Sequence, residues 1–417
     1  MNYRIIGAVQ TLFLGGLATT ALLASAATAS PATTSPTTAT AAKSSPFLVP
    51  LAAKASVPVP TLSAIALPAA TASKTATPLR LAQASTEDQL EGLLRRGREL
   101  VDAGNLADAI ATYEQAASLD PENAKIFSAI GFLQARQNNY EAAVEAYERA
   151  VRLDASNADF YYALGYSRAN LGNNEAAAQA YRRATELKRD YLEAYLGLGV
   201  VLAREEDFDG AIAAYQQVLA RRPNDARIHE SIGAAYIQEG RYQDAIAPLN
   251  QAIQLAPRRG SAYLNLGVAL LNLNQLQEGM DALKRAAELE PRNGLIYLQI
   301  GDIYKAQGNQ EQAIAQYQRA ISVQPSLVEA HIALGELYLE RDEYVRAIVT
   351  YRELVELAPD SPDALYHLGL ALKGRERIEE ATSTLRQARE LYAQQNNEDG
   401  VKNAEEALSD LERSGRP

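Results

Sequence analysis

Two consecutive stretches of 34 residues decide the fold of this 417-residue chain. Residues 158–191 read ADFYYALGYSRANLGNNEAAAQAYRRATELKRDY, and residues 192–225 read LEAYLGLGVVLAREEDFDGAIAAYQQVLARRPND. Aligned without a gap, they repeat two small residues and a large one: Gly165 and Gly199, Ala177 and Ala211, Tyr181 and Tyr215. Apolar residues recur at steps of three, four and seven, which is the spacing of one helix face. Each stretch therefore predicts two amphipathic helices.

The same register continues on both sides of these stretches without an insertion or deletion. Its marker is a glycine every 34 residues: Gly97, Gly131, Gly165, Gly199, Gly233, Gly267, Gly301, Gly335 and Gly369. Twelve residues after each glycine stands an alanine, replaced once by Gly279, and four residues further on a tyrosine or leucine. The two small residues let two helix axes approach closely, and the large residue fills the space beside them.

Residues suited to helix ends separate the predicted helices. Between the two helices of six units stands a residue that tolerates the left-handed conformation: Gly104, Asn138, Gly172, Gly240, Asn274 and Gly308. Residues able to cap the next helix are Asn123, Asn157, Asp225, Asn293 and Ser361. One helix pair cannot bury its own apolar faces, whereas nine stacked pairs can. We therefore predict an all-α solenoid of nine units over residues 87–393, followed by a capping helix and tail over 394–417.

The period and residue pattern resemble the tetratricopeptide repeat (TPR) family over about residues 90–393. The resemblance implies a right-handed superhelix whose first helices line a concave groove that binds a peptide or helix of a partner. Carrying the family's groove positions over gives an apolar floor and charged neighbours: Leu94, Phe132, Tyr162, Tyr166, Leu196 and Val200, with Arg136, Arg204, Asp302 and Glu336. The groove is expected to be acidic toward its end, which favours a ligand with basic residues. The alternative is that the rings merely pack between neighbouring helices.

The N-terminus has the pattern of a secretory signal peptide, predicted over residues 1–29. Arg4 precedes an apolar stretch over 5–23, and Ala-x-Ala cleavage sites follow at 24–26 and 27–29. Two alternatives stay open, namely an uncleaved membrane anchor over 5–23 and an organellar transit sequence.

Residues 30–86 are rich in Ala, Thr, Ser and Pro. Small side chains and proline bury too little area to offset the entropy of ordering, so this segment predicts a disordered linker. The first 86 residues hold five basic residues and no acidic one, whereas the remainder holds 35 basic and 51 acidic residues. A surface that acidic repels phosphate backbones, so no nucleic-acid partner is expected.

The composition also argues against catalysis and bound cofactors. The chain has no cysteine, which excludes disulfides, thiolate metal sites and cysteine nucleophiles. Of its three histidines, His229 and His331 occupy a repeat position where other units place aromatic rings, so both are expected in the core. No phosphate-binding glycine loop, paired-histidine helix or nucleophile elbow occurs. We expect no enzyme activity, no cofactor and no metal site.

These patterns predict an exported scaffold, periplasmic or otherwise extracytoplasmic, that binds a protein or peptide in its groove. The resemblance implies a role such as that of an assembly factor. The alternative is a structural spacer, tethered to a membrane by an uncleaved N-terminal segment or self-associating, with an empty groove.

Overall fold

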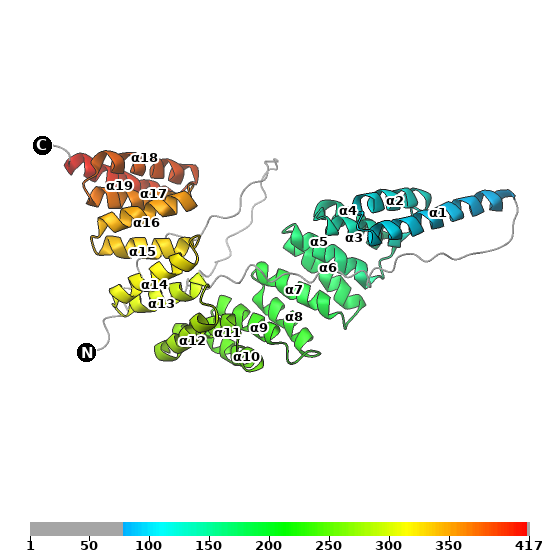
Figure 1. Ribbon diagram of the computed structural model, residues 1–417, viewed down its shortest axis with the longest axis horizontal. Coiled ribbons are helices and arrows are strands. Elements are labelled where there is room, and N and C mark those ends of the chain that lie inside the picture. Colours follow the sequence, from blue (N-terminus) through cyan, green and yellow to red (C-terminus); the bar gives the residue numbers. More distant parts are fainter. Residues whose placement is uncertain (1–77, 415–417) are drawn as a thin grey trace, which may run out of the picture. The chain divides into compact units, whose positions relative to one another are not determined.

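The structure, a computed structural model, describes residues 78–414. All 19 elements in this range are α-helices, so the all-α solenoid expected from the sequence is confirmed (Figure 1). The predicted signal peptide, the alternative anchor at 5–23 and most of the predicted linker lie outside the described residues. Within residues 78–414, no helix combines the length and apolar character needed to span a bilayer.

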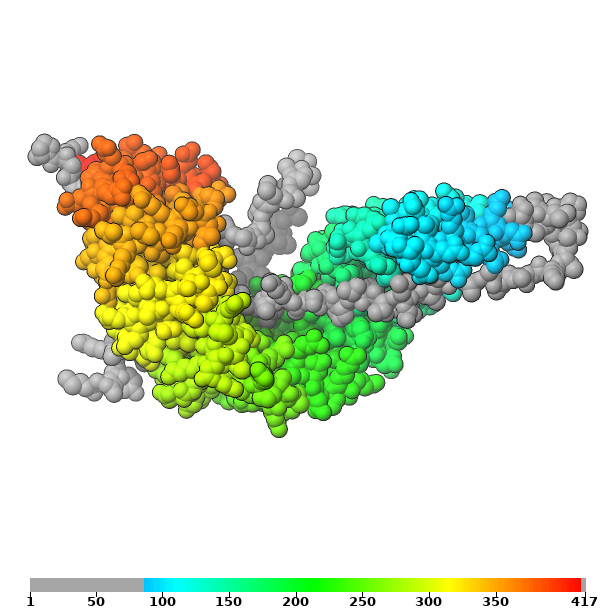
Figure 2. Space-filling model, in the orientation of Figure 1, coloured from blue at the N-terminus to red at the C-terminus, as the bar shows by residue number. Residues whose placement is uncertain are grey.

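The helices belong to two compact units. The N-terminal unit, residues 78–289, contains α1 (Pro78–Asp102), α2 (Leu106–Leu119), α3 (Ala124–Arg136), α4 (Tyr140–Leu153), α5 (Ala158–Asn170), α6 (Asn174–Leu187), α7 (Leu192–Arg204), α8 (Phe208–Leu219), α9 (Ala226–Gln238), α10 (Tyr242–Leu255), α11 (Gly260–Asn272) and α12 (Leu276–Leu289). The C-terminal unit, residues 290–414 and coloured from yellow to red in Figure 2, contains α13 (Gly294–Ala306), α14 (Gln310–Val323), α15 (Val328–Glu340), α16 (Tyr344–Leu357), α17 (Pro362–Gly374), α18 (Ile378–Gln394) and α19 (Glu398–Ser414).

Within each unit, every helix packs against the next one along the chain. Some odd-numbered helices two apart also touch, namely α3–α5, α5–α7, α9–α11, α15–α17 and α17–α19. No contact of comparable extent joins two even-numbered helices of the described residues. The odd-numbered helices therefore form the more closely spaced layer of each stack, as on the inner side of a curve.

The core repeats the small-against-large packing that the sequence predicts. Tyr181 and Tyr317 are fully buried. A Cβ atom added at Gly199 would lie 2.4 Å from the ring of Tyr215, closer than real contacts allow. Glycine at this position of the repeat is therefore required by the tyrosine of the paired helix, and this requirement recurs along the chain.

The turns within pairs use the left-handed conformation at the predicted residues and at others. Positive φ angles occur at all six predicted glycines and asparagines, from 61° at Asn138 to 79° at Gly172. Glu206, Asp342 and Glu376 also have positive φ, which the sequence analysis did not predict. All five predicted capping residues accept a hydrogen bond from a backbone N–H in the first turn of the helix that follows.

The two ends of the repeat region differ from the predicted boundaries. Helix α1 begins at Pro78, so the predicted disordered linker over 30–86 is wrong for its last residues. Proline sets a helical φ at a first helical position, and the Leu, Arg, Ala and Gln residues that follow it are good helix formers, although this stretch lacks the acidic residues that guided the boundary. At the other end, the expected capping helix is α19, which packs on α18 and α17 and buries Ala404 and Leu411.

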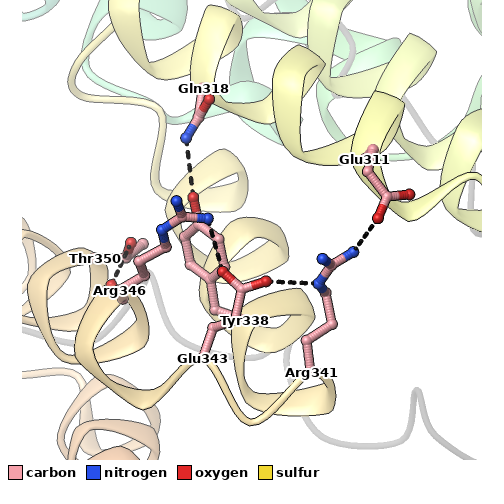
Figure 3. Close-up of polar contacts among 7 residues, drawn as sticks. All are labelled: Glu311, Gln318, Tyr338, Arg341, Glu343, Arg346 and Thr350. Atoms are coloured by element: carbon pink, nitrogen blue, oxygen red, sulfur yellow. Dashed lines mark hydrogen bonds and ion pairs between the residues drawn. The ribbon is translucent and has the colours of Figure 1, made fainter.

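Polar contacts join successive pairs in the C-terminal unit (Figure 3). Just after α15, the Arg341 guanidinium lies 2.8 Å from Glu311 of α14 and 2.7 Å from Glu343. Gln318 of α14 donates a hydrogen bond of 2.9 Å to the hydroxyl of Tyr338 in α15. The register between these pairs is thus fixed by polar bonds as well as by apolar packing.

Candidate partner-binding face

The candidate binding surface in each unit is the side of the odd-numbered helices to which the sequence assigns the groove. The N-terminal inner face comprises Leu94, Phe132, Arg136, Tyr162, Tyr166, Leu196, Val200 and Arg204. The C-terminal inner face comprises Asp302, Lys305, Glu336, Glu340 and His367. The predicted site residues therefore belong to two separate surfaces, one in each unit.

The aromatic floor of the N-terminal inner face is buried. Leu94, Phe132 and Val200 are covered, and Tyr162 is only 3% exposed. The Tyr162 ring centroid lies 5.9 Å from that of Tyr181 and 5.0 Å from that of Tyr191. The expectation that these rings stand exposed on the groove wall is wrong, because residues of the adjoining helix and turn cover them. The alternative, packing between neighbouring helices, describes Tyr162.

Tyr166 is likewise buried, and its ring lies edge-on to Tyr140 with centroids 6.3 Å apart. Burial, with the nearby Tyr140 hydroxyl, raises the pKa of Tyr166 to about 12. Leu196 is partly exposed. The N-terminal inner face thus offers a ligand little of the ring surface that the sequence analysis assigned to it.

Charged side chains are what this face exposes. Arg136 is exposed, and its guanidinium lies 5.8 Å from the centroid of Phe132. Arg204 is also exposed and donates a hydrogen bond of 3.3 Å to the carbonyl of Ala169 in the preceding pair. Both guanidinium groups therefore lie over a buried apolar layer.

The C-terminal inner face has a polar residue where the N-terminal inner face has a buried ring. At the equivalent position to Tyr166, α13 places Asp302, whose carboxylate accepts a hydrogen bond of 2.9 Å from the hydroxyl of Tyr317. Gln299 Nε2 lies 3.5 Å from the other carboxylate oxygen. Burial raises the pKa of Asp302 to about 7, although the Tyr317 hydrogen bond and Lys305 oppose this shift. Asp302 is therefore a carboxyl group that titrates near neutral pH.

A lysine joins two carboxylates across the helices of this face. Lys305 Nζ of α13 lies 3.5 Å from Glu336 and 3.1 Å from Glu340, both in α15. Their side chains remain 30% and 49% exposed, respectively, so solvent reaches both carboxylates.

Asp302, Lys305, Glu336 and Glu340 form a charged cluster. Two buried polar atoms near this cluster have no hydrogen-bond partner, namely the Tyr351 hydroxyl and His367 Nδ1. The two rings are stacked, with centroids 5.5 Å apart and planes 12° from parallel. Burial, with Glu336 and Glu340 nearby, raises the pKa of Tyr351. Burial lowers the pKa of His367, against the opposing effect of Glu336 and Asp363, so its imidazole is neutral at pH 7.

Sequence profiles of the family match most of the array. The profiles "TPR repeat" and "Tetratricopeptide repeat" match residues 97–138, 135–172, 162–226, 196–259, 236–299, 301–342, 335–374 and 363–394. The chain belongs to the tetratricopeptide repeat family. Because these matches overlap, they do not test the predicted number of nine units. No curated protein matches this TPR chain in sequence.

Solved TPR structures resemble parts of the chain. A tetratricopeptide repeat protein from Parabacteroides merdae ATCC 43184 is 19% identical over 60% of this chain and 99% of its own, with a TM-score of 0.46. Yeast Tom70 is 12% identical over 80% of this chain and 98% of its own, with a TM-score of 0.45. YrrB, described as a TPR protein with an unusual peptide-binding site, is 22% identical over 44% of this chain and 95% of its own, with a TM-score of 0.41.

Sequence reasoning missed several contacts of the TPR inner faces. Lys305 was not singled out, although a lysine one repeat before two glutamates offers a weak signal for an ion-pair bridge. His331 is buried as predicted, whereas His229 is only partly buried. Among residues 78–414, no group of three or more His, Asp or Glu side chains could hold a metal ion.

Proposed function

We propose that this TPR chain is a non-enzymatic scaffold that binds a segment of a protein partner on its inner faces. Repeat arrays of this kind present extended surfaces made of equivalent positions from successive pairs. The observation that carries the proposal is the exposure of charged side chains over well-packed inner faces. Arg136, Arg204 and Glu340 are exposed there, although the packing between pairs is carried by buried rings and small residues. Their charges therefore face solvent on these surfaces.

The proposal includes export from the cytoplasm, with a role such as that of an assembly factor. Its support is the sequence pattern over residues 1–29, a basic residue followed by an apolar run and Ala-x-Ala sites. The mass of the intact mature protein tests this part. A chain that starts after residue 26 or 29 is expected, and a mature chain that retains Met1 would instead favour the membrane-tethered spacer.

Affinity capture with the full chain as bait tests partner binding on the N-terminal inner face. The variant bait carries Arg136→Glu and Arg204→Glu, and the control bait carries Arg221→Glu and Arg258→Glu. The control makes the same change in charge at exposed turn residues of the same unit. A partner held by the wild-type and control baits and lost from the variant supports the proposal.

Two other outcomes would contradict partner binding on the N-terminal inner face. The same partners on all three baits would show that the partner contacts a surface other than that of Arg136 and Arg204. Capture of the chain alone would favour the self-associating spacer, because no partner would then need the inner faces.

A further inference from the structure

The C-terminal inner face carries more carboxylates than cations. Asp302, Glu336 and Glu340 gather around one cation, Lys305, which bridges the two glutamates. Lys305 also acts on Asp302, whose pKa it lowers against the effect of burial. Even with Asp302 protonated, the two glutamates exceed the single lysine charge. The cluster therefore carries at least one uncompensated negative charge.

The buried Tyr351 hydroxyl has no hydrogen-bond partner, and neither do the hydroxyls of Tyr113, Tyr147 and Tyr181 at the same repeat position. In the preceding repeat, Tyr317 occupies the same position and donates to Asp302. The corresponding acid for Tyr351 is Glu336, but Glu336 pairs with Lys305, and the fully buried Tyr351 hydroxyl is left without a partner. Glu336 is therefore held by Lys305 and not by the tyrosine of its own repeat, unlike Asp302.

The aromatic rings next to the carboxylates indicate which type of cation fits. His367 is neutral, its buried Nδ1 has no hydrogen-bond partner, and its ring is stacked on that of Tyr351. Tyr366 is partly exposed and meets the His367 ring edge-on at 5.3 Å. A guanidinium has five donors and no acceptor, pairs with carboxylates through two parallel bonds and stacks on aromatic rings, whereas an ammonium does only part of this.

We propose that Asp302, Glu336, Glu340 and His367 form a binding site for the guanidinium of an arginine side chain on the partner protein. The site rests on the proposed function, because it assigns one contact of the partner segment to the C-terminal unit. The arginine approaches from the solvent side, where Glu336 and Glu340 are partly exposed.

The test uses the full chain and a small probe, Nα-acetyl-arginine-N-methylamide. The chain has only three histidines, so side-chain NMR signals of His367 are assigned with His367→Gln and followed during titration. The His367 signals are expected to shift saturably with the probe, while those of His229 and His331 stay in place. The uncharged citrulline analogue is expected to cause no shift, and the lysine analogue a weaker one.

Matched variants separate the site from general charge. Glu336→Gln is expected to weaken probe binding about tenfold, since it removes a charged hydrogen-bond partner. Lys305→Gln is expected to tighten it, because the internal competitor is gone. The control Glu379→Gln/Glu390→Gln, on exposed residues of α18, is expected to leave affinity unchanged. Helicity by circular dichroism confirms that each variant is folded.

Several results would overturn the proposal. Equal shifts at all three histidines, unchanged affinity in Glu336→Gln, or no saturation with the arginine probe would each do so. Equal binding of the lysine analogue would reject a guanidinium site. Partner capture that succeeds while the arginine probe fails would reject this site and leave the proposed function intact.

Discussion

The N-terminal and C-terminal inner faces occupy equivalent repeat positions but differ in chemistry. The ninth position of the repeat holds the buried ring of Tyr166 in α5 and the carboxyl of Asp302 in α13. Four positions later stand the exposed residues Arg136 and Arg204 in one unit and Glu340 in the other. The repeat thus fixes where a side chain is placed, while the residue at that position decides whether it is buried in the packing or exposed.

The largest expected effect is on the buried rings of the N-terminal inner face. Tyr162→Ala is expected to lower the free energy of unfolding by about 3–5 kcal/mol, because the ring is buried against Tyr181 and Tyr191. Glu336→Ala in the C-terminal unit is expected to cost under about 1 kcal/mol, because its ion pair is partly exposed. Urea unfolding with amide exchange resolved by helix measures both. Equal losses of unfolding free energy in the two variants would contradict the contrast between the packed N-terminal inner face and the more exposed C-terminal inner face.

A smaller effect distinguishes two tyrosines at the same repeat position. Tyr317→Phe removes a hydrogen bond to the Asp302 carboxylate and is expected to cost about 1.5–3 kcal/mol. Tyr181→Phe removes a buried hydroxyl that has no hydrogen-bond partner and is expected to be neutral or stabilising. Thermal unfolding of both variants beside the wild type measures the difference. A cost for Tyr181→Phe as large as that for Tyr317→Phe would show that its hydroxyl is satisfied.

The titration of Asp302 gives the C-terminal unit a pH dependence of its own. Burial raises its folded-state pKa to about 7, above an unfolded value of about 3.9. Its contribution to stability is therefore fully present below about pH 4 and is lost as the pH rises through about 7.

Asp302→Asn removes this titration and keeps an oxygen to accept from Tyr317. The stability of the wild type relative to this variant is expected to fall between about pH 4 and pH 8. Exposed Asp360→Asn serves as control and is expected to show no such trend. A constant difference between wild type and Asp302→Asn across this range would contradict the account.

The smallest effect concerns an exposed residue of the N-terminal inner face. Arg136→Gln is expected to lower stability by at most about 1 kcal/mol, since only its contact with the Phe132 ring is lost. The same change is expected to weaken partner capture. A stability loss comparable to that of Tyr162→Ala would assign Arg136 to the packing.

The fold could be predicted because its determinants lie within one repeat. Gly199 must be small to admit Tyr215, and Asn157 caps the helix that directly follows it. Such requirements recur every 34 residues and leave a periodic signal. The left-handed turn residue was less predictable, because the helix end imposes that conformation on whichever residue stands there, as on Glu206.

The candidate site was predicted less well, since its contacts run between repeats. Tyr162 is covered by Tyr191, which lies in the turn before the next pair. Lys305 reaches from α13 to two glutamates of α15. A repeat position predicts which helix face a residue lies on. It does not predict which side chains of a neighbouring repeat contact that residue, so its burial and ion pairs could be seen only in the structure.

Site-specific photo-crosslinking tests the central claim, partner binding on the inner faces, most directly. The photoreactive p-benzoyl-phenylalanine is placed at exposed inner-face positions Arg136, Arg204 and Glu340, and for comparison at exposed Arg152 and Glu379 of even-numbered helices. The account predicts crosslinks to the same partner from the inner-face positions and none from the other two. Crosslinks confined to the even-numbered helices, or to a second copy of the chain, would contradict it.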